Sequence, residues 1–181
     1  MRTMRRYHNL SLSIFLLLLS VNPLTEHVEY SDVIVFMLTH YAIFASGLLL
    51  LRTVRANALL ILPSALIAAL WHLPLPFYLS SHFPLYRYAM EASLFCAGAL
   101  AGASIQAMSN MWRAVALGLW IISDTALSVI FLSYPSIYDM GRDPYPLWQF
   151  PVLGIFMILL MNIIVALLLY TYMQTFNPYH R

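Results

Sequence analysis

Four ionisable side chains lie inside long apolar stretches of this sequence, where they could do chemistry. They are His40, His72, Glu91 and Asp124. Placing an ionisable group inside a bilayer costs free energy, so such groups usually face the protein interior and often have a function there. Each also has a simpler interpretation, in which it only fastens one helix to another.

His40 is preceded by Met37, three positions earlier. On a helix this spacing places an imidazole and a thioether on one face. Imidazole binds copper, and thioether sulfur suits the reduced metal, so the pair predicts a copper ligand set. The alternative is a buried histidine bonded to the backbone or a hydroxyl of a neighbouring helix, with the methionine as packing material.

His72 lies in a Trp-His-Leu-Pro-Leu-Pro run at residues 71–76. The two prolines remove backbone donors and predict a helix that breaks near its outer end. Ala65, Ala68 and Ala69 precede His72 on the same face, and small residues mark a close helix contact. His72 is therefore expected to point toward other helices; the alternative is a proline-terminated helix with an interfacial tryptophan and histidine.

Glu91 and Asp124 have the stronger structural interpretations. Glu91 follows Arg87 by four residues, a spacing typical of an ion pair along one helix. If Arg87 instead extends to the external interface, Glu91 faces inward beside Met90. Asp124 has serine and threonine neighbours whose hydroxyls could hold it. We therefore predict a metal site made by His40, His72, Glu91 and Met37, without Asp124.

The elements that must position these residues follow from composition. Hydrophobic residues make up 62% of the 181-residue chain and charged residues 9%, against roughly 25% charged residues in soluble domains. Long apolar runs predict helices near residues 10–24, 33–51, 58–79, 86–108, 114–132 and 150–173. The expected fold is an all-α, polytopic transmembrane bundle of about six helices, forming one integral membrane domain over residues 1–181.

The first apolar segment resembles a signal peptide, because three arginines precede a short run of leucines. No small-residue cleavage site follows it, so an uncleaved anchor is favoured; cleavage would leave five helices. Arginines indicate the orientation, since positive residues gather in cytoplasmic loops. With the N-terminus cytoplasmic in the cell membrane, seven of the nine basic residues lie inside: Arg2, Arg5, Arg6, Arg52, Arg55, Arg113 and Arg181.

Two further patterns concern packing and depth. Gly98 and Gly102 form a G-x-x-x-G spacing, which predicts that the fourth segment sits centrally. His40, His72, Glu91 and Asp124 each lie roughly 6 to 10 residues, or about 9–15 Å, from an outer helix end. One outward-opening polar pocket would explain this common depth.

Several functions are excluded by what the sequence lacks. The net charge of +2 is small and scattered, so a nucleic-acid partner is not expected. There is no nucleophile-elbow motif, phosphate-binding glycine loop, zinc-spaced cysteine pair or C-x-x-C-H haem motif. We therefore expect no enzyme activity.

The Trp-His-Leu-Pro run (71–74), followed by Glu-Ala-Ser-Leu-Phe (91–95), resembles the CtaG-type family of haem-copper oxidase assembly factors. Thr39-His40 is similar to a His-bearing stretch of that family, and residues 149–157 echo its Gln, Gly and Met pattern. Glu91 and Phe36 stand where the family has histidines. Size and composition look more like a compact archaeal membrane family related to it.

The resemblance implies an accessory or assembly factor of a respiratory oxidase, with copper as the cofactor. Its partners would be the lipid bilayer and the subunits of that oxidase or of another membrane complex. Two alternatives stay open. One is a non-catalytic structural subunit of a membrane complex. The other is an electron carrier with haem between His40 and His72.

Overall fold

The protein is an all-helical bundle. The computed structural model describes residues 2–140 and 144–176, and every regular element within these ranges is a helix. The all-α prediction is therefore confirmed. Four helices are long and apolar enough to cross a membrane, and six crossings result if each of two bent helix pairs counts as one. The elements are α1 (Arg2–Ser20), α2 (Pro23–Glu29), α3 (Val33–Leu51), η1 (Ala58–Leu60), α4 (Ile61–Trp71), α5 (Pro74–His82), α6 (Pro84–Ile105), α7 (Asn110–Ser133), η2 (Pro135–Ile137) and α8 (Gln149–Phe176).

The first candidate crossing is a bent pair. Helices α1 and α2 meet at 55°, where Asn22 accepts hydrogen bonds from the amides of Leu24 and Thr25 and Pro23 begins the new helix. Asparagine is a favoured N-cap, and proline is tolerated in the first helical turn because its missing amide has no partner there. The predicted segment near 10–24 therefore starts earlier and continues around a bend.

The second bent pair contains the predicted helix break. Helices α4 and α5 meet at 70°, because α4 ends at Trp71 and Pro74 starts α5. A proline cannot continue a helix without losing a hydrogen bond and clashing with the preceding turn. The break predicted from the Trp-His-Leu-Pro run is confirmed, and it leaves His72 as the C-cap of α4.

The closest helix contact joins α3 and α6. A Cβ added at Gly98 would lie 2.0 Å from the carbonyl oxygen of Phe44, and one at Gly102 would lie 2.2 Å from that of Leu48. Gly47 of α3 makes the reciprocal contact, 2.0 Å from the carbonyl oxygen of Phe95. Side chains would hold these backbones apart, so the predicted close crossing is confirmed. Helix α6 also packs against α4 and α5, which makes it central.

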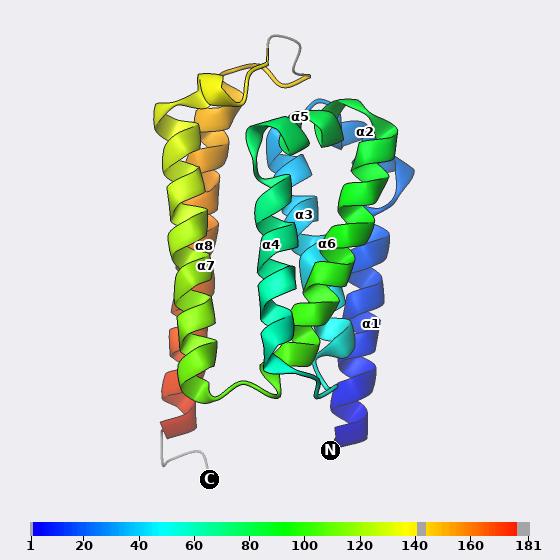
Figure 1. Cartoon of the computed structure of the whole chain (residues 1–181), viewed down its shortest axis with the longest axis vertical. Helices are drawn as coiled ribbons and strands as arrows, with labels where there is room; N and C mark the ends of the chain where they lie inside the picture. Colours follow the sequence, from blue (N-terminus) through cyan, green and yellow to red (C-terminus); the bar gives the residue numbers. More distant parts are fainter. Residues whose placement is uncertain (1, 141–143, 177–181) are drawn as a thin grey trace.

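Helices α7 and α8 form a hairpin beside the other helices (Figure 1). Only 22% of the apolar window in each of them is buried inside the protein, against 50% in α6. The outer faces of the hairpin are thus apolar and exposed, as a lipid-facing surface requires. Helix α8 meets the rest of the bundle at α3.

The upper end of the bundle, as drawn in Figure 1, carries α2, α5 and η2. Here Phe77 of α5 lies 5.3 Å from the ring centroids of both Phe36 and Tyr138. Phe131 of α7 and Phe150 of α8 pack around the same ring. Edge-to-face contacts of this kind stabilise aromatic clusters. The cluster joins the hairpin to the other helices directly above the candidate site.

Candidate metal site at the histidine pair

His40 and His72, called here the histidine pair, lie side by side near the upper end of the bundle. Their ring centroids are 5.9 Å apart, with an angle of 60° between the ring planes. His40 comes from the middle of α3 and His72 from the break after α4. The structure therefore brings together two of the four predicted ligands from helices that are distant in sequence.

The hydrogen bonds of the histidine pair define the state of each ring. Nδ1 of His40 lies 2.5 Å from the Phe36 carbonyl oxygen, and Nδ1 of His72 lies 2.6 Å from that of Ala68. A carbonyl only accepts, so each Nδ1 carries the proton and each Nε2 keeps a free lone pair. Metal-binding histidines typically use one nitrogen this way to fix the ring for the other.

Nε2 of His40 is buried and has no hydrogen-bond partner among the residues that the structure describes. His40 itself is only 2% exposed. Leaving a buried polar atom unpaired costs free energy. The alternative, a histidine bonded to the backbone or a hydroxyl of a neighbouring helix, is not what the described residues show: Nδ1 bonds to a carbonyl of its own helix, and Nε2 has no partner. A ligand at Nε2 would remove this cost.

Met37 is fully buried one helical turn before His40. The i, i+3 relation keeps its thioether on the same side of α3 as the imidazole. Among the described residues there is no group of three or more histidine, cysteine, aspartate or glutamate side chains placed to hold a metal. The possible ligands at the histidine pair are therefore the two imidazoles and the thioether of Met37, which is on the same helix as His40. A structural zinc site needs four ligands, usually cysteine thiolates and imidazoles, so this set is too small for one.

Arg87 lies in a buried ion pair with Glu29, whereas the sequence predicts either a pair with Glu91 or an extension to the external interface. Its Nη1 donates a hydrogen bond to Glu29 Oε2 at a distance of 3.1 Å, and both side chains are 1% exposed. Its guanidinium carbon also lies 3.9 Å from the ring centroid of Tyr30, a cation–π contact. Helix α2 turns away from α1 and places Glu29 beside Arg87 of α6.

Glu91 belongs to this charged region. It is 6% exposed on α6, and it lies on the same helix face as Arg87, four residues earlier. In the described part of the chain no hydrogen bond joins it to either imidazole. The geometry thus places Glu91 with the ion pair, and its role as a metal ligand stays a prediction.

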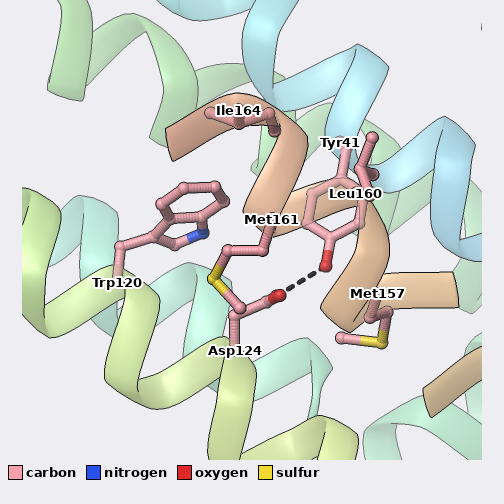
Figure 2. Close-up of a pocket in the computed structure, with 7 residues that line it drawn as sticks. All are labelled: Tyr41, Trp120, Asp124, Met157, Leu160, Met161 and Ile164. Carbon is pink, nitrogen blue, oxygen red and sulfur yellow. Dashed lines mark hydrogen bonds between the residues drawn. The ribbon is translucent and has the colours of Figure 1, made fainter. Parts of the chain in front are cut away.

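Asp124 of α7 is held by a residue that the sequence did not indicate. The Tyr41 hydroxyl donates to its Oδ1 over 2.5 Å, as Figure 2 shows. Ser128, expected to hold the carboxyl group, donates instead to the Asp124 main-chain carbonyl, and Thr125 donates to the Ile121 carbonyl.

Two tyrosines between α7 and α8 donate hydrogen bonds to backbone carbonyls near the site. Tyr138 donates to the His72 carbonyl over 2.6 Å, and Tyr145 donates to the Glu29 carbonyl over 2.6 Å. The helix break freed the first of these carbonyls, so Tyr138 satisfies a group that would otherwise be orphaned. Burial raises the pKa of Tyr138 to about 12, so its hydroxyl stays a donor at any physiological pH. The side chain of Gln149, the first residue of α8, also forms hydrogen bonds here. It accepts one from the Val33 amide and donates one to the Ser31 carbonyl.

These hydrogen bonds could not be predicted from the sequence, because nothing in the local pattern identifies which carbonyl each hydroxyl reaches. The prolines after His72 gave one usable signal, because a broken helix must have its free carbonyls satisfied by some donor.

Comparison with known proteins adds one finding. A family model matches residues 11–175, which include both histidines and every candidate ligand. The chain belongs to the DUF1404 family. That family is described as a protein of unknown function, so membership in DUF1404 assigns no activity to the histidine pair. No curated protein and no solved structure matches the chain.

Proposed function

We propose that this DUF1404 protein is a membrane-embedded accessory or assembly factor of a respiratory oxidase that binds reduced copper at the histidine pair. The observation that carries the proposal is the unpartnered Nε2 of His40 beside the ring of His72. The apolar helices support a location in the cell membrane. The arginine distribution supports a cytoplasmic N-terminus.

The donor set favours copper over harder metals. His40 and His72 supply imidazole, and Met37 adds a thioether on the same side of α3 as His40. Soft ligands select copper in its reduced state, whereas magnesium or calcium would need several oxygen ligands. Both imidazoles have Nδ1 bonded to a carbonyl, so the rings are oriented before a metal arrives. The link to an oxidase rests on the resemblance of the Trp-His-Leu-Pro and Glu-Ala-Ser-Leu-Phe stretches to CtaG-type factors.

Metal titration of the detergent-purified protein tests the proposal. Under anaerobic conditions, His40→Ala and His72→Ala should each lower the bound Cu(I) by one equivalent. The affinity of the remaining imidazole for Cu(I) should be lower by about 10–100-fold or more. Losing a residue that only hydrogen-bonds to a metal ligand already lowers affinity by that range. His27→Ala is the matched control, because His27 is exposed on α2.

Two results would overturn the copper proposal. Equal copper binding by the wild type and both site variants would show that the histidine pair holds no metal. The protein would then be better explained as a structural subunit, in which Arg87–Glu29 and Tyr41–Asp124 fasten the helices. A Soret band that disappears in His40→Ala would instead identify the haem-binding electron carrier.

A further inference from the structure

A second group of soft and anionic side chains lies at a small cavity where α3, α7 and α8 meet. The cavity is small, with a volume of about 10 Å³, which is room for about one water molecule. Figure 2 shows its lining, which is formed by Tyr41, Trp120, Asp124, Met157, Leu160, Met161 and Ile164. The histidine pair is not part of this lining.

Met157 and Met161 are four residues apart on α8, so their thioethers lie on one face of that helix. They are 0% and 5% exposed. In the view of Figure 2 the two sulfur atoms lie on either side of the Asp124 carboxyl group. Thioether sulfur is a soft ligand that binds reduced copper in preference to hard cations.

Asp124 supplies negative charge to the same cavity. It is 8% exposed, and within the described ranges no arginine forms an ion pair with it. The Tyr41 hydroxyl occupies one acceptor position, whereas a carboxylate offers about four. A buried carboxylate must be protonated, paired or bound to a metal. The indole of Trp120 lines the cavity too, and its ring face attracts cations.

We propose that Met157, Met161 and Asp124 form a second binding site for reduced copper, separate from the histidine pair. Tyr41 is a positioning residue, since it holds the carboxyl group and does not itself need to touch the metal. The choice of copper rests on the proposed function of the histidine pair. Because Tyr41 directly follows His40 on α3, the two proposed sites involve neighbouring positions of that helix.

The test is an anaerobic Cu(I) titration of the full-length protein in detergent against a competing chelator, repeated with Ag(I). The wild type should bind two equivalents of either ion. The double variant Met157→Leu/Met161→Leu should bind one, because leucine keeps the packing volume and removes the sulfur. The double variant His40→Ala/His72→Ala should also bind one. Met111→Leu is the matched control, since Met111 is 70% exposed, and it should bind two.

The two double variants separate the failure of one site from the failure of the other. Two equivalents in Met157→Leu/Met161→Leu, with one in the histidine variant, would overturn the second site and leave the proposed function standing. One equivalent in the methionine variant, with two in the histidine variant, would overturn the proposed function and leave the second site standing.

X-ray absorption at the copper edge gives an independent readout that does not depend on stoichiometry. Sulfur scattering should persist in the histidine variant and decrease in the methionine variant; unchanged sulfur scattering in the methionine variant would overturn the second site.

Discussion

Three buried side-chain atoms lack a hydrogen-bond partner in the described part of the chain: Glu29 Oε1, Arg87 Nη2 and His40 Nε2. The first two belong to one ion pair, where the opposite charge compensates for much of the missing hydrogen bonding. The third belongs to a neutral ring, and no charge compensates for it. This difference separates a group that holds the fold together from a group that is free to bind a ligand.

The Glu29–Arg87 pair gives a prediction at the residue scale. Glu29→Gln should lower the free energy of unfolding by about 3–5 kcal/mol, because it leaves a buried guanidinium without a counter-charge. Replacing both partners, Glu29→Leu with Arg87→Met, should cost clearly less, since no uncompensated charge remains. Unfolding in mixed detergent, followed by circular dichroism, measures both values. If the single and double variants are equally stable, the pair is not coupled.

At the scale of elements, backbone contact decides which helices are central. Helices α3 and α6 approach closely enough that the Cβ of one helix would meet a carbonyl of the other. Gly118 of α7 is different, because a Cβ there would meet no atom within 4 Å. Gly98 thus permits a close helix contact, whereas Gly118 makes none. Both lie on long apolar helices, so only the surrounding structure distinguishes them.

This contrast gives a prediction with its own control. Gly98→Ala should lower the free energy of unfolding by about 1–3 kcal/mol or more, because the added methyl group forces α3 and α6 apart. Gly118→Ala should leave stability unchanged or raise it by up to about 1 kcal/mol, since alanine is the better helix former. Thermal melts in detergent compare the two variants. A Gly98→Ala protein as stable as Gly118→Ala would contradict the close crossing.

At the scale of the whole molecule, the residues that converge at the upper end come from most of the chain. Helices α2, α5 and η2 lie at this end, whereas α1 begins and α8 ends at the other (Figure 1). Hydrogen bonds of Tyr145, Gln149 and Tyr138 reach α2, the start of α3 and the helix break at His72. The α7–α8 hairpin is therefore bonded to the chain around the histidine pair.

The arginine distribution predicts that this upper end faces outward from the cell. In a Cys96→Ser background, Ser136→Cys should react with an impermeant thiol reagent on intact cells, and Thr53→Cys should react only after lysis. Both positions are exposed. Ser81, near the end of α5, is a poor probe because it is 0% exposed. Labelling of Thr53→Cys but not Ser136→Cys on intact cells would reverse the orientation.

The sequence by itself determined the features that depend on neighbouring residues. Apolar runs long enough to cross a bilayer identified the helices, and α3 has the predicted bounds of 33–51. Pro74 fixed the break at His72, since a proline acts on the turn that precedes it. Counting residues from the outer helix ends placed His40 and His72 at one depth, and their rings are neighbours in the structure.

Only the tertiary structure decided the partners across helices. Arg87 had a plausible partner four residues away in Glu91, yet it pairs with Glu29, 58 positions away. Asp124 had hydroxyls beside it, yet Tyr41 holds it from 83 positions away. Helical periodicity states which residues share a face, but not toward which neighbour that face is turned. That depends on where close packing, here at Gly47, Gly98 and Gly102, allows the helices to cross.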